Sequence, residues 1–155
     1  MRDQVGFCSQ VAFGNKLELL KWAREVKHCD WDEKSINQAA FVGNLEILRY
    51  CFANGCPYEE ETACHNAAGK GHLDSLRFLF DKVKPSRGTE TTAAHMATSH
   101  GQLHIFKYFV EERKISREQI SGCLLNASGY GHLDCLKYLL EAARPDLDNL
   151  SLIHI

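Results

Sequence analysis

The chain has 155 residues, of which 45% are hydrophobic and 25% charged, so it is long enough for a substantial core and has no low-complexity composition. Its 18 Lys and Arg against 20 Asp and Glu give a formal net charge of -2, which excludes a strong positive field for nucleic acid or an anionic membrane. We therefore expect one domain over residues 1–155, with no nucleic-acid and no membrane partner.

The seven cysteines are an odd count, and Met1 to Gly6 lack the apolar segment of a signal peptide. Reduced thiols are therefore expected, in a cytoplasmic or nuclear protein. Five thiols fall inside helical apolar patterns, where free cysteine behaves as a small buried hydrophobic residue. These are Cys8, Cys51, Cys64, Cys123 and Cys135.

A block of about ten residues recurs five times. Its leading leucines are Leu17, Leu45, Leu73, Leu103 and Leu133, at intervals of 28, 28, 30 and 30 residues. Self-similarity at such a spacing is typical of a stacked repeat array. An array of this kind presents an extended surface rather than a catalytic pocket, so we predict a binding module and no enzyme.

Each unit is predicted to hold two helices joined at a glycine, which makes the fold an all-α solenoid of helix-turn-helix repeats with short loops. In chain order the units are expected at residues 1–28, 29–57, 58–86, 87–115 and 116–145, with a partial sixth unit at 146–155. In the first unit, the extra residue Lys16 between glycine and leucine predicts a locally different turn.

From the second unit onward, small residues such as Ala39-Ala40 and Ala67-Ala68 precede the glycine, so that neighbouring helices can approach closely. The glycines that follow are expected to have positive φ, because each ends a helix: Gly43, Gly71, Gly101 and Gly131. Asp32 and Thr89 are expected to cap the first helices of the second and fourth units, and Ser116 with Gln119 forms a capping box in the fifth.

The segments Thr62–Leu73 and Thr92–Gly101 resemble the ankyrin-repeat core T-P-L-H-x-A-A-x-x-G-H, and the correspondence extends over residues 3–145. The threonines are not followed by proline, and the units are shorter than the usual ~33 residues. In this the chain is similar to divergent ankyrin arrays of large DNA viruses and unicellular eukaryotes. The shortened links predict simple loops instead of projecting β-hairpins. The resemblance also implies that His65 and His95 bridge neighbouring repeats through backbone hydrogen bonds.

The resemblance further implies a protein partner, of unknown identity, bound on the concave side by exposed positions of the first helices. These positions are Gln38, Phe41, Val42, Asn66, Lys70, Met96, Ser99, His100, Asn126 and Tyr130. The leading hypothesis is an adaptor, either monomeric or within a hetero-complex. The alternative is a structural scaffold subunit held permanently in a larger assembly.

Two other patterns invite a chemical interpretation. His100 and His104 have helical spacing for a metal, but Gly101 intervenes and no third ligand follows, so neither a metal nor another cofactor is expected. The second helices carry an aromatic series, predicted to be core, and a basic series, predicted to be a solvated outer stripe neutralised by acidic residues one turn earlier. The aromatic series is Trp22, Tyr50, Phe78, Tyr108 and Tyr138, and the basic series is Lys21, Arg49, Arg77, Lys107 and Lys137.

Overall fold

The computed structural model of the chain describes residues 4–142, and the predicted partial sixth unit lies outside this range. Within it, the chain forms ten helices. They are α1 (Gln4–Phe13), α2 (Leu17–Glu25), α3 (Glu33–Val42), α4 (Leu45–Ala53), α5 (Glu60–Lys70), α6 (Leu73–Val83), α7 (Arg87–Ser99), α8 (Leu103–Glu111), α9 (Arg117–Gly129) and α10 (Leu133–Ala142).

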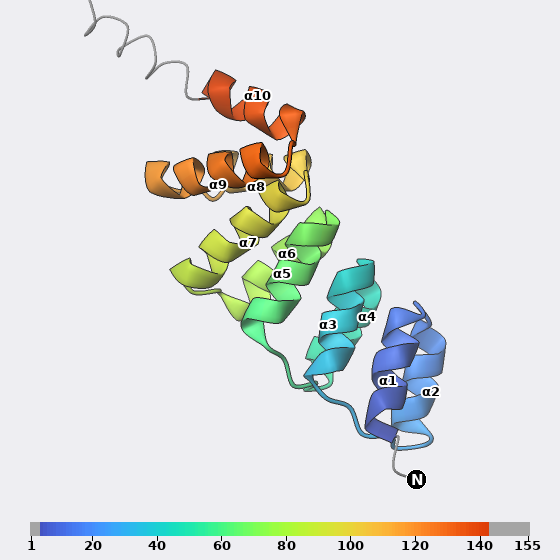
Figure 1. Ribbon diagram of the computed structural model, residues 1–155. Coiled ribbons are helices and arrows are strands. Elements are labelled where there is room, and N and C mark those ends of the chain that lie inside the picture. Colours follow the sequence, from blue (N-terminus) through green and yellow to red (C-terminus); the bar gives the residue numbers. More distant parts are fainter. Residues whose placement is uncertain (1–3, 143–155) are drawn as a thin grey trace, which may run out of the picture.

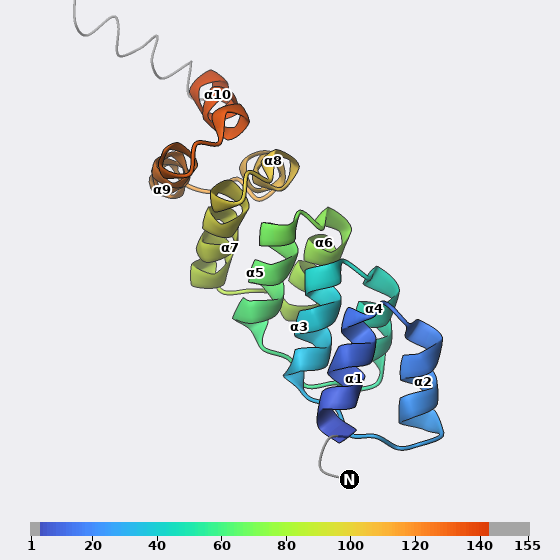
Figure 2. The same cartoon turned by 45° about the vertical axis from the view of Figure 1, so that its right-hand side comes forward.

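Consecutive helices pair into five helix-turn-helix units, stacked from α1 at one end to α10 at the other (Figure 1). The first helix of each unit lies in one row and the second helix in another (Figure 2). Contacts between neighbouring units are denser in the first-helix row than in the second-helix row. The all-α solenoid that the repeat spacing predicts is confirmed.

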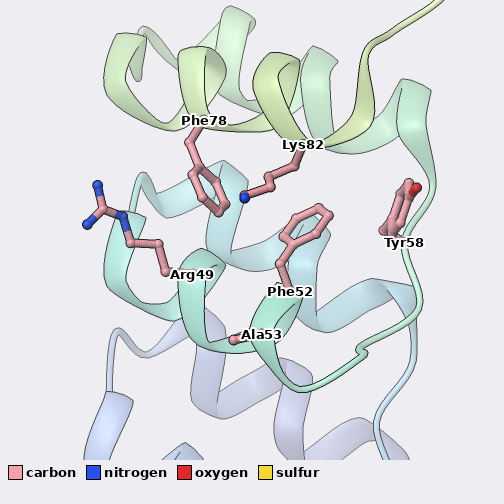
Figure 3. A pocket seen from close by; sticks show the side chains of 6 residues that line it. All are labelled: Arg49, Phe52, Ala53, Tyr58, Phe78 and Lys82. Atoms are coloured by element: carbon pink, nitrogen blue, oxygen red, sulfur yellow. The ribbon is translucent and has the colours of Figure 1, made fainter.

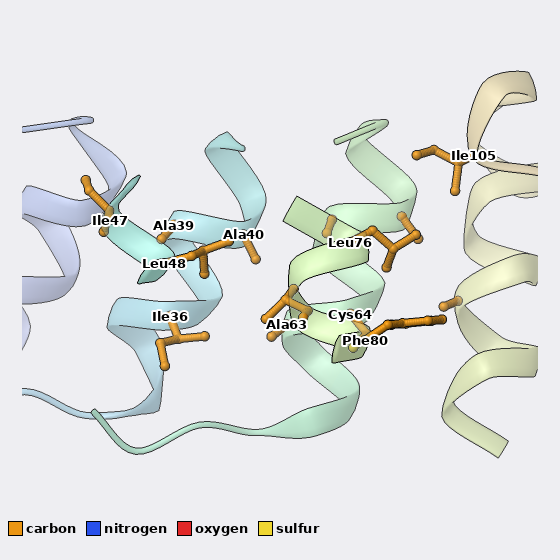
Figure 4. Packing of buried hydrophobic residues seen from close by; sticks show 14 of the residues in the cluster. Ile36, Ala39, Ala40, Ile47, Leu48, Ala63, Cys64, Leu76, Phe80 and Ile105 are labelled. Carbon is orange, nitrogen blue, oxygen red and sulfur yellow. The ribbon is translucent and has the colours of Figure 1, made fainter. Parts of the chain in front are cut away.

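The core is a continuous layer between the two rows. Ile36 on α3, Leu48 on α4 and Leu76 on α6 are fully buried in it (Figure 4). Ala39 and Ala67 are also fully buried, and their small side chains allow the first helices to lie close together. Because each unit buries its apolar face against its neighbours, stacking creates the core that one unit could not form alone.

The turn between the two helices of a unit follows the predicted geometry from the second unit onward. Positive φ is confirmed at the four glycines, with 77° at Gly43, 82° at Gly71, 69° at Gly101 and 75° at Gly131. In the first unit the left-handed residue is Asn15, with φ 62°, and not Gly14. The extra residue Lys16 lengthens this turn by one position.

The predicted helix caps are confirmed in two of three cases. The Asp32 carboxylate accepts a hydrogen bond from the backbone N–H of Lys34 at 3.1 Å, and Ser116 and Gln119 form the capping box of α9. The assignment of Thr89 was wrong, because Ser86 caps α7 and accepts from the N–H of Thr89 at 3.2 Å. Pro85 lies in the link before α7, and the helix begins at Arg87, two residues before Thr89.

All seven cysteines are buried free thiols, which confirms the prediction of reduced cysteines. Burial raises the pKa of Cys64 to about 12, and Glu60 adds to this shift. The thiol rather than the thiolate is therefore the form that the fold accommodates, and these cysteines serve as small apolar residues.

Candidate functional site

Neighbouring units are joined by hydrogen bonds from the residue that follows each turn glycine. His72 Nε2 lies 3.0 Å from the carbonyl oxygen of Phe41, and His132 Nε2 lies 2.8 Å from that of Ser99. In the unit between them, Gln102 Nε2 donates to the carbonyl oxygen of Gly69 at 3.1 Å. The three acceptors occupy equivalent positions near the ends of α3, α5 and α7, so the bonds set the register of the first helices.

The expectation that His65 and His95 bridge the repeats was wrong. Their Nε2 atoms are buried and have no hydrogen-bond partner among the described residues. Burial lowers the pKa of His65, which the Glu61 carboxylate only partly opposes. The bridging histidines are His104, whose Nε2 lies 2.7 Å from the carbonyl oxygen of Gly71, and His72 and His132, because a residue at the start of a second helix reaches the preceding unit's carbonyl group. The recurring Gly-His-Leu that contains His72 and His132 was the sequence signal.

The ten predicted partner-binding residues lie on the first helices or at their C-terminal ends. We call this surface the first-helix face. Its best-connected part joins the first three units, where Lys70 Nζ lies 4.4 Å from the centroid of the Phe41 ring. The Phe41 ring is in turn 6.1 Å from that of Phe13. An apolar strip with one cation at its edge therefore runs across α1, α3 and α5.

The first-helix face continues over α7. A Cβ atom at Gly69 would lie 3.5 Å from His100 Nδ1 and 3.7 Å from Met96 Cε, so these two groups lie over α5 at ordinary contact distance. His100 Nδ1 is also 2.9 Å from the carbonyl oxygen of Met96 and helps to end α7. Met96 is half-buried and His100 is exposed.

Several of the predicted residues also hold the array together. Asn66 donates to the carbonyl oxygen of Asn37 at 3.1 Å and links α5 to α3, and the carbonyl group of Ser99 accepts the bond from His132. Gln38 lines a shallow cavity of about 210 Å³ with Phe13. Val42 and Asn126 are half-buried on α3 and α9. The face therefore combines groups that are free to contact a partner with groups that fix its shape.

The ends of the first-helix face are the most exposed. Tyr130 is 67% exposed and stacks on His132 with ring centroids 6.4 Å apart. Phe13, 54% exposed, and Leu125, 74% exposed, were missed by the sequence reasoning. Phe13 stands directly before a turn glycine, as Val42 and Lys70 do, and this shared position could have identified it.

On the opposite side of the array, the outward surface of α2, α4, α6, α8 and α10 forms what we call the second-helix face. Its aromatic series was predicted to be core, which is confirmed for Tyr108 and in part for Tyr50, Phe78 and Tyr138, which pack against the core, and is wrong for Trp22. Trp22 is 43% exposed, and Tyr50, Phe78 and Tyr138 are half-buried, whereas Tyr108 is buried. The second helices are less closely packed than the first, so their aromatic rings reach the surface.

The basic series meets these rings from the preceding unit. Arg77 Cζ lies 5.3 Å from the centroid of the Tyr108 ring, and Lys107 Nζ lies 5.3 Å from that of Tyr138. The predicted neutralisation one turn earlier holds for Lys21, whose Nζ is 2.9 Å from Glu18 Oε1. Arg77 instead pairs with Glu112 of the next unit. A long basic side chain that extends toward the neighbouring unit contacts the aromatic ring of that unit before it reaches the carboxylate on its own helix.

The described residues contain no group of three His, Cys, Asp or Glu side chains placed to hold a metal ion. No helix among them has the length and apolar character required to cross a membrane.

A family model described as ankyrin repeats (many copies) matches residues 36–80 and 64–110. No curated protein matches the chain at a significant level. Ankyrin repeats generally mediate protein–protein interaction and are typically not catalytic. With five stacked helix pairs and this match across its central units, the chain has the fold of an all-α ankyrin-type solenoid.

Proposed function

We propose that the protein is a non-catalytic interaction module, an adaptor that binds a protein partner on the concave side of the array through the first-helix face. The observation that carries this proposal is the strip formed by Phe13, Phe41 and Lys70, whose side chains contact one another across three successive units. Aromatic residues in contact with each other and partly open to water are typical of the energetic centre of an interface. Lys70 at its edge favours an acidic group on the partner.

The alternative is a structural scaffold subunit held permanently within a larger assembly. It is favoured by the large apolar residues exposed at the α9 and α10 end, where Leu125, Leu133 and Leu140 are mostly open to water. Burying such side chains in an obligate contact would stabilise the array. Light scattering of the purified chain separates the two: an adaptor is a monodisperse monomer, and an obligate subunit self-associates or aggregates.

The remaining parts of the proposal rest on composition and resemblance. A net charge of -2 favours a protein partner over nucleic acid or a membrane surface. Reduced, buried thiols are consistent with a cytoplasmic or nuclear location. We propose no cofactor. The likeness of the short units to arrays of large DNA viruses and unicellular eukaryotes stays a prediction about origin.

The test begins with affinity capture of partners and their identification by mass spectrometry. With a partner in hand, Phe41→Ala and Tyr130→Ala should each weaken binding by more than about 1 kcal/mol. Lys107→Ala is the matched control, because Lys107 lies on the second-helix face. If Lys107→Ala weakens binding and the two aromatic variants do not, the partner binds the other side and the proposed site is wrong.

A further inference from the structure

A second candidate site lies on the second-helix face, between α4 and α6. It is a cavity of about 390 Å³ lined by Arg49, Phe52, Ala53, Tyr58, Phe78 and Lys82 (Figure 3). Small residues fill the space between neighbouring helices of the first-helix row. The helices of the second-helix row pack less closely and leave an opening between them. Tyr58, from the loop between α4 and α5, forms one side of the opening.

The walls of this cavity are aromatic. The ring centroids of Phe52 and Phe78 are 5.7 Å apart at an interplanar angle of 83°, and those of Phe52 and Tyr58 are 5.2 Å apart. Phe52 and Phe78 are half-buried and Tyr58 is exposed, so the three rings leave apolar surface in contact with water. An apolar group inserted between them would remove that surface from water, which is favourable.

Two cations flank the same aromatic wall. Arg49 Cζ and Lys82 Nζ each lie 5.9 Å from the centroid of the Phe78 ring, one from α4 and one from α6 (Figure 3). Neither forms an ion pair with a carboxylate of residues 4–142, unlike Lys21 and Arg77, which do. The cavity therefore offers two positive charges that the array itself does not neutralise.

We propose that this cavity binds an acidic peptide segment in which one aromatic or long aliphatic side chain is flanked by Asp or Glu. The apolar side chain enters between Phe52, Tyr58 and Phe78, and the flanking carboxylates pair with Arg49 and Lys82. The volume is at the small end of the range of ligand pockets, which suits one side chain rather than a whole cofactor. This site is separate from the first-helix face and does not depend on it.

The lining favours a peptide over a nucleotide. Phosphate groups are usually held by backbone N–H groups of a glycine-rich loop or a helix N-terminus. No glycine lines this cavity, and its two cations come from within α4 and α6 rather than from a helix start. Side-chain cations on either side of an aromatic wall match separated carboxylates better than one compact phosphate.

The test is a titration of the ¹⁵N-labelled full chain followed by NMR, with the blocked heptapeptide GEDFDEG as probe. Amide shifts should concentrate in α4, α6 and residues 54–59, and saturate with a Kd of about 1 mM or lower. The peptides GEDSDEG and GQNFNQG, which lack the ring or the charges, should bind at least about fivefold more weakly. No saturable shifts, shifts centred on the first-helix face, or equal binding of the three peptides would overturn the proposal.

Variants make the assignment specific. The double variant Arg49→Gln, Lys82→Gln should weaken binding of GEDFDEG about tenfold, whereas Lys107→Gln, which removes another exposed cation outside the cavity, should leave it unchanged. All three positions are exposed, and thermal melting of each variant verifies the fold. Equal affinity of the double variant and the parent chain, or tighter binding of adenosine monophosphate than of the peptide in the same cavity, would refute an acidic-peptide site.

Discussion

His72 Nε2 lies 3.0 Å from the carbonyl oxygen of Phe41, and the ring that makes this bond fills the space in front of Gly43. A Cβ atom at Gly43 would overlap that ring. The glycine therefore has two roles: it adopts the left-handed turn conformation at φ 77°, and it leaves room for the bridging residue of the next unit. Turn geometry and unit stacking thus depend on the same position.

This relationship predicts that Gly43→Ala is more damaging than backbone strain alone. Gly55 has a similar φ of 71° and nothing within 4 Å of its Cβ position, so Gly55→Ala measures the strain by itself. We expect a loss of about 1 kcal/mol at Gly55 and at least about 1 kcal/mol more at Gly43, in urea unfolding.

The cause of the extra loss can be isolated with His72→Ala. In that background the ring is absent, so Gly43→Ala should cost only what Gly55→Ala costs. An extra loss that persists without His72 would show that the glycine is needed for another reason.

The bridging position should accept histidine and glutamine interchangeably. Gln102 donates to the carbonyl oxygen of Gly69 as His72 and His132 donate to theirs. We therefore expect Gln102→His to change the free energy of unfolding by less than about 0.5 kcal/mol, and Gln102→Leu to cost about 1–3 kcal/mol because it leaves the carbonyl group unpaired. Equal losses for the two variants would mean that the hydrogen bond contributes nothing measurable.

Stability should be concentrated in the central units. Leu76 on α6 is fully buried, and Leu76→Ala should reduce the free energy of unfolding by about 2–5 kcal/mol. Leu140 on α10 is mostly exposed, so Leu140→Ala should cost less than about 1 kcal/mol in the same thermal and urea measurements. Similar losses at the two leucines would show that Leu140 is packed as tightly as Leu76 and that the α10 end is no weaker than the central units.

The buried thiols predict a loss of stability at alkaline pH. The pKa of Cys64 rises from 9.0 to about 12 on folding, so the folded state keeps its proton while the unfolded chain releases it. The stabilisation is complete below pH 9.0 and is lost as pH rises toward 12, with a slope of about 1.4 kcal/mol per pH unit for one thiol.

Urea unfolding over this pH range, with Cys64→Ala as comparison, measures that slope directly. The variant is expected to lose some stability at every pH, but its alkaline slope should be shallower. Burial also raises the pKa of Tyr50 and Tyr138 to about 12, so part of the alkaline slope remains in the variant. An unchanged slope in the variant would show that Cys64 ionises as readily in the folded state as in the unfolded state.

The sequence predicts the periodic parts of the fold well, because helix pairing and turn glycines are local properties. Positive φ at Gly71 follows from its position after a helix, with no knowledge of the neighbouring unit. Contacts between units were harder to predict. From the sequence alone, either His65 or His72 could bridge neighbouring units. Only the distance between the stacked units determines that His72 is the residue that reaches a carbonyl oxygen.

The candidate sites show the same limit. The first-helix positions could be named from the repeat pattern, but the contact between Phe41 and Lys70 depends on the offset between α3 and α5. The cavity beside Phe78 was not predicted, because one-dimensional spacing does not reveal how far two second helices diverge. Of its lining residues, Phe78 and Arg49 were recognised as members of regular series, whose regularity suggested core and solvent instead of a pocket, and Phe52, Tyr58 and Lys82 were not recognised.

Each bridge has its donor at the start of a second helix and its acceptor near the end of the preceding unit's first helix, so the third and fourth units each carry one donor and one acceptor in the same relative place. A duplicated unit of this kind would therefore contain both a donor and an acceptor for these hydrogen bonds. Duplication or deletion of the whole third or fourth unit should leave a continuous array with its bonds intact, whereas an insertion between the acceptor and the donor of one unit would change their relative place. The junctions thus make the length of the array adjustable in steps of one unit without any change to the units themselves.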